Sequence, residues 1–564
     1  MRNVIGGVVL AATLGLGSPG WAERAVPHPD LTVSGPQSPV AMAVRDALQA
    51  RLSKSSTAHG AYEDRGYLPI WYSPRGEATP ALRALSQTLS QAAAHGLPTD
   101  RYALPDAGPA TPEEIAAREV TTTLAFVAYA RDLTSGLLEP SKVDSDIHVK
   151  PPRPVPGELI AGFTAATDRG AWFAALAPQD PAYDALRHRY DMLIALAETE
   201  AWGAPVANGR LLREGDRSAR IPGLRARLTA LGDYRAEDAT APAEEQLVLG
   251  PSAVMYDTAM PILAEDDPEL YDSALAAAVR RFQARHGLNQ DAMIGPATLA
   301  QLNADATFRA QQILVNLERM RWTNRPRGER YIAVNLADFQ MRLVDGGETR
   351  FTSRVVVGKA AKHETPEFSD VMEYMVVNPT WHVPRSIAGK EILPKLQEDP
   401  GYLDQKNMTL KGIDPWSVDW HSITPATFPG RVAQKPGDGN ALGQVKFMFP
   451  NDFSIYLHDT PAKSLFAKDM RAHSHGCVRV EKPVELAQTL LTGQNDDPAA
   501  AFEAWVARGK ETWVHFDEPW PVHLYYRTAW LDAEGALQFR GDIYDRDARA
   551  LALMAEAGVE GAQP

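Results

Sequence analysis

Hydrophobic residues recur at helical spacing through most of the first 205 positions. A Thr-Pro pair at 79–80 starts one such run, in which leucines follow at 82, 85 and 89 and Gly96 ends it. Threonine before proline is typical of a helix N-terminus, and glycine of a helix end. Similar runs cover residues 120–133 and 182–197. We therefore expect a helical scaffold domain over residues 41–205, without a cluster of histidines, cysteines or paired carboxylates.

A second helical pattern lies between residues 206 and 304. Its later half begins at Asp272, a good N-cap, and carries Val279 and Phe282 at helical spacing before Gly287. An acidic stretch rich in alanine and proline interrupts the unit at 235–267. The spacing predicts a small three-helix domain over 206–304. A connecting helix is expected at 305–329, because residues 313, 317 and 320 are apolar at i, i+4 and i+7.

The hydrophobic period changes to two after residue 330, which indicates strands. The expected strands cover residues 331–334, 340–344, 351–357, 371–377 and 445–449. The segment Asp345-Gly346-Gly347 separates two of them and favours a hairpin turn, since glycine accepts a positive φ. The pattern predicts a mainly β domain over 330–517, followed by a C-terminal extension over 518–564.

Residues 380–443 interrupt the β region with a long stretch dense in proline, glycine and tryptophan. A connection of this length inside a compact domain is usually functional. We expect it to carry short helices and to cover a site as a lid. The fold class is therefore multi-domain α+β, with a helical N-terminal scaffold, a small three-helix domain and a mainly β domain with a lid insertion.

The first residues have the pattern of a secretory signal peptide over 1–22. A short positive region is followed by the apolar residues 4–16 and by Gly20-Trp21-Ala22, which has the small-x-small pattern of a cleavage site. The apolar run is shorter than the ~20 residues of a membrane span, which disfavours an anchor. We expect cleavage after residue 22, a flexible leader over 23–40, export, and no membrane span in the mature chain.

Charge excludes two classes of partner. The formal net charge is -14, and it becomes more negative by one unit when Arg2 leaves with the signal peptide. A strongly acidic chain has no broad attraction for nucleic acid or anionic membranes, so neither is expected as a partner. With 45% hydrophobic and 23% charged residues, the composition is that of an ordinary globular protein.

The chain has a single cysteine, Cys477. Cysteines of exported proteins are usually paired, so a lone thiol is either a small buried hydrophobe or a reactive group. Its surroundings favour the reactive group, because His458, His473 and His475 lie near it in sequence and make up three of the 14 histidines.

The residues around Cys477 include the parts of an acyl-transfer site. A free thiol has a pKa of about 8.5, and a nearby imidazole is the ordinary way to raise its small thiolate fraction. His458 ends an apolar strand pattern from which it can reach Cys477, and the Asp459 carbonyl can orient its ring. Gly476 permits a tight turn, and the N–H groups of Gly476 and Cys477 can face a developing oxyanion.

His458 followed by Ser-His-Gly-Cys-Val-Arg at 474–479 resembles the signature of the YkuD-type L,D-transpeptidase catalytic domain. The resemblance continues through residues 378–384, 390–394 and 439–443 with Lys446. Residues 278–302 resemble a small helical peptidoglycan-binding domain. Together with the segment Arg65–Trp71, these modules resemble the large YcbB-like branch of that family, over nearly all of the mature chain.

The resemblance implies roles for individual residues. Cys477 matches the nucleophile and His458 the group that accepts and returns its proton, with the Asp459 carbonyl orienting the ring. His475 either holds the catalytic loop through the backbone or takes part in proton transfer. The residues implied in shaping the site and binding substrate are Tyr456, Ser474, Gly476, Arg479, Trp381 and Asn440. No cofactor and no metal are implied.

Two other kinds of site can be weighed against this one. His473, His475 and Cys477 alternate and could share one strand face as zinc ligands, but no second cysteine exists and the Ser474 and Gly476 positions suggest a turn. A papain-like peptidase would place its histidine after its cysteine, whereas His458 precedes Cys477.

The expected function is that of a periplasmic L,D-transpeptidase. By resemblance, it forms an acyl-enzyme on Cys477 from peptidoglycan tetrapeptide stems, releases D-alanine and makes 3→3 diaminopimelate cross-links. Peptidoglycan is the expected partner, with peptidoglycan synthases and carboxypeptidases as candidate protein partners and carbapenems as inhibitors. The alternatives are a catalytically inert peptidoglycan-binding scaffold, an L,D-carboxypeptidase and an enzyme that attaches lipoproteins, since the acyl acceptor is open.

Overall fold

The computed structural model describes residues 38–52, 58–199, 202–235 and 267–563. These residues pack around four apolar cores, one each for the N-terminal helices, the small helical unit, the large sheet and the 380–443 insertion. The expected signal peptide, the leader up to residue 37 and almost all of the expected insertion at 235–267 lie outside the described residues.

The N-terminal region is helical, as its spacing predicts. Thr79 caps one helix by accepting the Leu82 N–H at 3.2 Å, and Thr111 forms a capping box with Glu114 at the start of another. The helices are α1 (Pro39–Arg51), α2 (His59–Glu63), α3 (Pro80–Leu89), α4 (Pro112–Ser135), α5 (Pro140–Val143), α6 (Pro156–Ala165), α7 (Arg169–Ala174) and α8 (Pro181–Thr199). Their apolar faces bury an aromatic cluster around Trp71 and Phe126.

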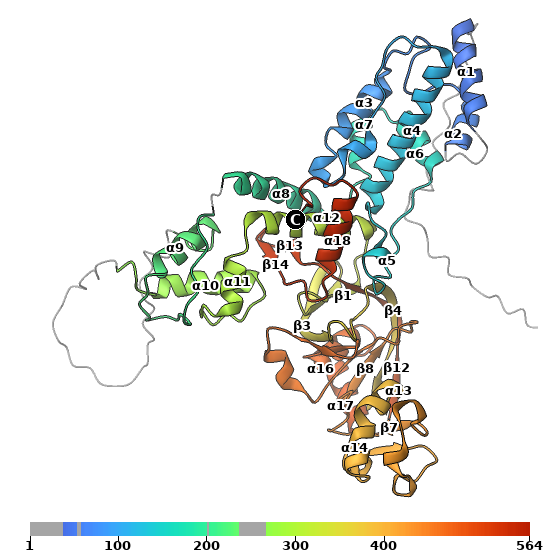
Figure 1. Ribbon diagram of the computed structural model, residues 1–564. Helices are drawn as coiled ribbons and strands as arrows, with labels where there is room; N and C mark the ends of the chain where they lie inside the picture. Colours follow the sequence, from blue (N-terminus) through green and yellow to red (C-terminus); the bar gives the residue numbers. More distant parts are fainter. Residues whose placement is uncertain (1–37, 53–57, 200–201, 236–266, 564) are drawn as a thin grey trace, which may run out of the picture.

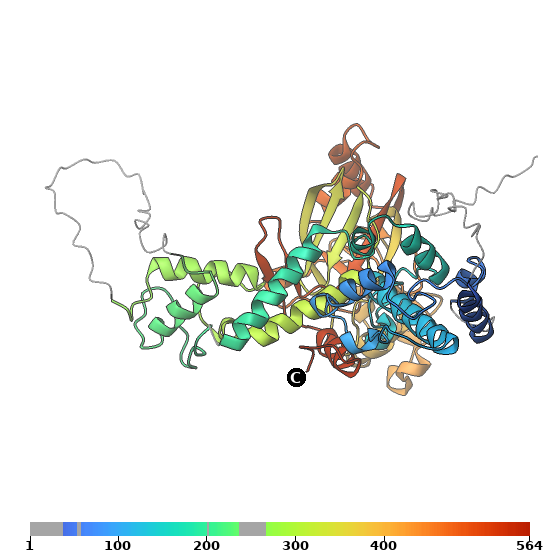
Figure 2. The same cartoon turned by 90° about the horizontal axis from the view of Figure 1, so that it is seen from above.

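The described residues of the small unit form three helices, as expected. They are α9 (Ile221–Ala230), α10 (Ser273–Arg285) and α11 (Pro296–Leu302). Asp272 caps α10 by accepting the Leu275 N–H at 2.8 Å, and Val279 and Phe282 are fully buried. The unit lies to one side of the molecule, beyond α8 and α12 (Figures 1 and 2).

The helix α12 (Ala306–Trp322) joins the N-terminal helices to the end of the chain. Apolar residues of α12 share one core with α4 and α8, and also with α18 (Arg546–Glu556) and the hairpin β13 (Ala529–Leu531) and β14 (Leu537–Phe539). The expected connecting helix is thus the centre of a core built from both ends of the described chain.

A nine-stranded sheet lies next to this core, in the order β10-β3-β11-β9-β8-β4-β12-β1-β2. Strand β2 also pairs with β3, so the sheet closes on itself. The strands are β1 (Tyr331–Asn335), β2 (Gln340–Asp345), β3 (Glu348–Gly358), β4 (Phe368–Val377), β8 (Val445–Met448), β9 (Leu457–His458), β10 (Ala472–Ser474), β11 (Val478–Val480) and β12 (Thr512–Tyr525). Gly346 and Gly347 have φ of 62° and 76°, which fits the predicted hairpin between β2 and β3.

The boundary expected at residue 517 falls inside β12. This strand pairs with β4 on both sides of an irregularity between His515 and Trp520, and Trp520 is buried in the core of the sheet. The acidic, proline-containing residues 517–519 interrupt the period-two pattern there. The strand therefore continues past residue 517 although its period-two pattern does not.

Two helices follow β11 and complete the core of the sheet. They are α16 (Pro483–Leu490) and α17 (Pro498–Ala507), which bury Leu486, Leu490 and Phe502 against the strands.

The insertion at 380–443 has a small core of its own around Leu396, Trp420 and Phe428. It contains α13 (Arg385–Ile387), the π-helical turn η4 (Ala388–Ile392), α14 (Leu393–Glu398), α15 (Tyr402–Gln405) and a sheet of β5 (Trp381–His382), β7 (Val432–Gln434) and β6 (Met408–Leu410). Helices α1–α4, α6 and α7 and the insertion lie at opposite ends of the molecule, with the large sheet between them (Figure 1). Among the described residues, no helix has the length and apolar character needed to cross a bilayer.

Candidate active site

The strands β9 and β11 bring the motif residues together. They are parallel neighbours, with Val478 opposite Leu457 and Arg479 opposite His458. Leu457 and Val478 are fully buried in the core of the sheet. Because side chains alternate along a strand, His458 and Arg479 lie on the opposite face, and the residues before the buried pair, Tyr456 and Cys477, share that face.

The next strand adds a cation to the same face. Lys446 of β8 lies opposite His458, and its Nζ is 5.9 Å from the centre of the Tyr456 ring. The Tyr456 and His458 rings have their centres 5.6 Å apart, and the Cys477 thiol donates to the Ser454 carbonyl at 3.6 Å. One face of three adjacent strands therefore presents a thiol, a phenol, an imidazole and two cations.

The loop before Cys477 is fixed by Ser474. Its hydroxyl donates to the Cys477 carbonyl at 2.6 Å and accepts the Gly476 N–H at 3.1 Å. Gly476 has φ of 113°, and a Cβ there would lie 3.2 Å from Ile455 Cδ1, so the position requires glycine. The sequence suggested that the N–H groups of both Gly476 and Cys477 could face an oxyanion, but Ser474 already binds that of Gly476.

His458 is held in one orientation by its neighbour. The side chain is 5% exposed, and its Nδ1 lies 2.5 Å from the Asp459 carbonyl. A carbonyl only accepts, so Nδ1 carries the proton and Nε2 keeps its lone pair. The Asp459 carbonyl is the partner that the sequence suggested.

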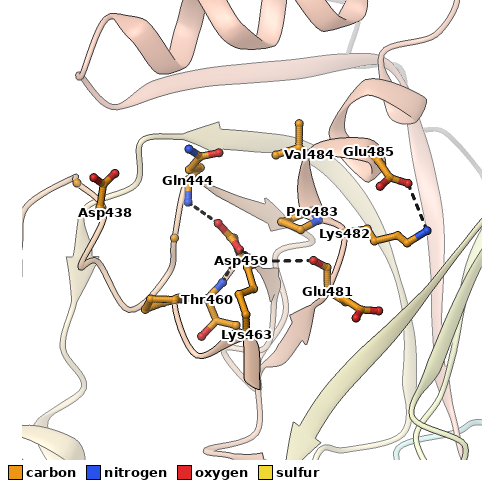
Figure 3. Close-up of a pocket in the computed structure, with 13 residues that line it drawn as sticks. Asp438, Gln444, Asp459, Thr460, Lys463, Glu481, Lys482, Pro483, Val484 and Glu485 are labelled. Atoms are coloured by element: carbon orange, nitrogen blue, oxygen red, sulfur yellow. Dashed lines mark hydrogen bonds and ion pairs between the residues drawn. The ribbon is translucent and has the colours of Figure 1, made fainter. Parts of the chain in front are cut away.

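The Asp459 carboxylate is anchored on the side away from His458. It accepts from Lys463 Nζ and the Thr460 N–H, each at 2.6 Å, and from the Gln444 N–H at 2.9 Å. These four residues line part of a pocket of about 460 Å³ between the ends of β9 and β11 (Figure 3). The contacts of the carboxylate fix the residue whose carbonyl orients the imidazole.

Burial favours the neutral forms of His458 and Cys477. It lowers the pKa of His458 to about 4, with the Arg479 charge acting in the same direction. Burial also raises the pKa of the Cys477 thiol, although Tyr456 and Arg479 oppose the increase. The structure therefore differs from the expectation that the imidazole raises the thiolate fraction, because desolvation penalises both charged forms. At pH 7 the resting pair is thiol and neutral imidazole.

His475 connects the loop before Cys477 to the insertion. Its Nε2 lies 2.6 Å from Glu391 Oε1 in η4, and its ring centre is 4.6 Å from that of His363. The Glu391 charge also acts on Arg479. The insertion therefore contacts the motif directly, beside the face that holds Cys477.

Two expected substrate-binding residues lie at the base of the insertion. Trp381 is half-buried in β5, opposite Gln434 of β7. Asn440 is buried, and its amide nitrogen contacts the carbonyls of Pro379, Gln434 and Lys435 at 2.9 to 3.4 Å. Its amide group thus joins the two ends of the insertion.

Sequence reasoning assigned no role to Thr365 and Tyr544. The Thr365 hydroxyl donates to the Gly476 carbonyl at 2.7 Å, and the Tyr544 hydroxyl accepts the Thr365 N–H at 3.3 Å. Neither residue lies in a motif, and no sequence pattern points to these contacts.

One cluster of three residues in the described part of the chain has the spacing of metal ligands, namely Asp144, Asp146 and Glu364. Arg546 lies 3.3 Å from Asp144 and 3.5 Å from Glu364, and Arg549 also binds Asp144. Two guanidinium groups therefore already balance this acidic cluster.

Comparison with protein families decides what the sheet domain is. Residues 329–499 match the family described as "L,D-transpeptidase catalytic domain". This region is an L,D-transpeptidase domain. Residues 56–189 match a family described as "Scaffold domain", and residues 257–302 match one described as "Putative peptidoglycan binding domain". The L,D-transpeptidase match ends at residue 499, so β12 and Tyr544 lie outside it.

Two curated relatives share parts of the chain. A Haemophilus influenzae protein named "Putative L,D-transpeptidase" is 36% identical over 242 residues, which are 42% of this chain and 48% of that protein. The Mycobacterium tuberculosis protein "N-acetylmuramoyl-L-alanine amidase CwlM" is 36% identical over 104 residues, 18% of this chain and 20% of that protein. The chain thus spans about half of the first relative and a fifth of the second.

A solved L,D-transpeptidase from Stackebrandtia nassauensis is also similar. It is 13% identical, with a TM-score of 0.20, and the comparison covers 57% of this chain and 97% of that one.

Proposed function

We propose that this protein is a cysteine-dependent L,D-transpeptidase that acts on peptidoglycan outside the cytoplasm, in the periplasm. The observation that carries the proposal is the shared face of β9 and β11. There, within the L,D-transpeptidase domain, Cys477 and His458 are diagonal neighbours and the Asp459 carbonyl holds His458 Nδ1.

The first half of the reaction forms an acyl-enzyme. The Cys477 sulfur attacks the diaminopimelate carbonyl carbon of a tetrapeptide stem while His458 Nε2 takes the thiol proton. A C–S bond forms, the C–N bond to the terminal D-alanine breaks, and His458 returns the proton to the leaving amine. Because the resting pair is neutral, the proton moves as the sulfur attacks.

The second half transfers the acyl group. The side-chain amine of a second stem attacks the thioester carbon, the C–S bond breaks, and the amine's proton returns to sulfur through His458. The product is a 3→3 cross-link between two diaminopimelate residues. Attack by water gives an L,D-carboxypeptidase reaction from the same acyl-enzyme.

The surrounding residues have proposed roles that follow from their positions. Arg479 and Lys446 flank His458 and are placed to bind substrate carboxylates, since both are partly exposed cations on the reacting face. Tyr456 lies beside the thiol and opposes the increase that burial causes in the Cys477 pKa. Ser474 and Gly476 shape the loop, and His475 holds the loop against Glu391.

The insertion and the small helical unit are proposed to bind substrate. Glu391 brings the insertion onto the catalytic loop, with Trp381 and Asn440 at its base, so we propose that residues 380–443 cover the bound stem as a lid. The peptidoglycan-binding match at 257–302 supports attachment to the wall polymer. Peptidoglycan synthases and carboxypeptidases are the proposed protein partners.

The proposal is tested by mass analysis of products from a disaccharide-tetrapeptide and a disaccharide-pentapeptide. We expect the tetrapeptide to lose D-alanine and form dimers, and the pentapeptide to remain unchanged. Equal turnover of both would refute the L,D specificity. Hydrolysis without dimers would instead favour the carboxypeptidase.

A second arm identifies the nucleophile. Wild-type protein is expected to gain one carbapenem adduct by intact-protein mass spectrometry, and Cys477→Ala none. His458→Ala should slow adduct formation by a factor on the order of 10² or more. His421→Ala, at an exposed histidine in the insertion, is the matched control and should react like wild type. An unreactive wild-type thiol would favour the inert scaffold.

A further inference from the structure

The carbonyl immediately before the nucleophile is bound by a side chain from another strand connection. Thr365 is fully buried between β3 and β4, and its hydroxyl donates to the Gly476 carbonyl at 2.7 Å. A trans peptide is planar, with its C=O and N–H pointing in opposite directions. Thr365 therefore sets the direction of the Cys477 N–H, which belongs to the same peptide and points away from Thr365.

The Cys477 N–H is left without a protein acceptor while its neighbours are bound. Ser474 holds both the Gly476 N–H and the Cys477 carbonyl. In the part of the chain that the structure describes, no acceptor receives the Cys477 N–H. A backbone donor kept unpaired beside a nucleophile suits a developing oxyanion.

Thr365 is itself held by the C-terminal part of the chain. The Thr365 hydroxyl accepts the Gly358 N–H at 2.9 Å, and the Tyr544 hydroxyl donates to the Gly358 carbonyl at 2.7 Å while accepting the Thr365 N–H at 3.3 Å. Tyr544 is 1% exposed. The Tyr544 hydroxyl thus joins the Gly358 carbonyl to the Thr365 N–H, and we call these contacts the Thr365 bracket. Because the Thr365 hydroxyl accepts from the Gly358 N–H, its own proton remains for the Gly476 carbonyl.

Arg546 also contacts residues of the Thr365 bracket. The guanidinium of Arg546 lies 4.8 Å from the centre of the Tyr544 ring, contacts the Thr365 carbonyl at 3.4 Å and pairs with Glu367 at 3.0 Å. Tyr544 and Arg546 come after residue 499, where the L,D-transpeptidase match ends. The loop that carries Cys477 is therefore completed by residues outside the matched domain.

We propose that Thr365 is a positioning residue for acyl transfer, held in place by Tyr544. It orients the Gly476–Cys477 peptide so that the Cys477 N–H donates to the oxyanion that forms when sulfur attacks the substrate carbonyl. This inference rests on the proposed function, because an oxyanion forms only if Cys477 acts on a carbonyl.

Two reactions of the same sulfur separate this role from a merely structural one. Acyl transfer passes through an oxyanion, whereas alkylation by iodoacetamide displaces iodide at carbon and forms none. Loss of an oriented N–H should therefore slow acyl transfer and leave alkylation nearly unchanged. Loss of packing around the loop would change both rates.

The experiment compares Thr365→Val, which keeps the shape and removes the hydroxyl, with Thr365→Ser, which keeps the hydroxyl. For Thr365→Val we expect acyl-enzyme formation from the tetrapeptide to fall by a factor on the order of 10², the usual effect of losing one oxyanion donor. Its alkylation rate should stay within about twofold of wild type, and Thr365→Ser should restore most of the acylation rate. Thr352→Val, at an exposed threonine of β3, is the matched control.

The inference is overturned if Thr365→Val acylates at the wild-type rate, or if acylation and alkylation fall together. If Thr365→Val does not fold, Tyr544→Phe decides, because it removes one hydroxyl and keeps the ring. We expect its acylation to fall about tenfold with alkylation preserved, in keeping with one neutral hydrogen bond; equal acylation would overturn the inference. An unacylated wild type would refute the proposed function itself.

Discussion

The charge state of Cys477 and His458 follows most directly from their burial. Burial lowers the pKa of His458 to about 4 and raises the pKa of the Cys477 thiol. At neutral pH the structure thus holds a neutral pair, whereas an imidazolium–thiolate pair would need the opposite shifts. The perturbation to apply is pH, and the quantity to measure is the rate at which iodoacetamide alkylates the folded protein.

The expected profile follows from the thiolate fraction. A thiol with the ordinary pKa of about 8.5 is only a few per cent thiolate at pH 7, and a raised pKa makes this fraction smaller still. The alkylation rate should therefore rise about tenfold per pH unit between pH 6 and 8 and show its midpoint above pH 8.5. An ion pair would instead give a nearly constant rate from about pH 5 to 8.

Intact-protein mass spectrometry follows the reaction without ambiguity, because the chain has one cysteine. Cys477→Ala should remain unlabelled at every pH. His458→Ala should keep the same steep profile, since a neutral imidazole contributes little to the thiolate fraction. A plateau below pH 7 in wild type that disappears in His458→Ala would refute the neutral pair and restore the ion-pair expectation.

Three further predictions concern the insertion, the domain contacts and pH stability. Glu391→Gln removes the carboxylate next to His475; as both side chains are partly exposed, the contact is worth under about 1 kcal/mol, and steady-state kinetics should show at most a fivefold loss of acyl transfer. A loss above 10²-fold would mean that Glu391 acts in the chemistry. Arg546→Met leaves buried carboxylates unpaired and should lower the free energy of unfolding by about 3–5 kcal/mol in urea denaturation, while a change below about 1 kcal/mol would contradict the network. Burial lowers the pKa of His95 to about 3 and that of His523 to about 4. Below the unfolded histidine pKa of about 6.5 the unfolded chain therefore binds more protons than the folded one, and the urea midpoint should fall as pH drops from 6.5 toward 4. A constant midpoint would contradict these pKa shifts.

Local patterns in the sequence predicted much of the fold. The strands around 331–377 followed from period-two alternation, and the turn at Gly346-Gly347 followed from its two glycines. That His458 and Cys477 come to neighbouring strands could also be expected, since His458 ends a short apolar run and the motif that contains both residues resembles a known signature.

Long-range contacts could not be predicted in the same way. Thr365 and Gly476 are 111 residues apart, and Tyr544 and Gly358 are 186 apart, so no local periodicity relates them. The direction of the Cys477 pKa shift was missed for a related reason. Charge neighbours can be guessed from a motif, but desolvation depends on how completely the sheet and loop exclude water. The interrupted pattern at 517–519 hid the end of β12 because an irregular strand lacks a constant period.

The core shared by α4, α8, α12 and α18 has a consequence for how the protein matures. Residues near both ends of the described chain build that core, so the N-terminal helices cannot finish packing until the last segment has been synthesised. Tyr544 comes from the same late segment and braces the loop of Cys477. The loop that carries Cys477 therefore reaches this geometry only after the C-terminal segment has been synthesised and packed. A chain that ended before Tyr544 would still contain Cys477, but it would lack the hydroxyl that holds Thr365 against the Gly476 carbonyl.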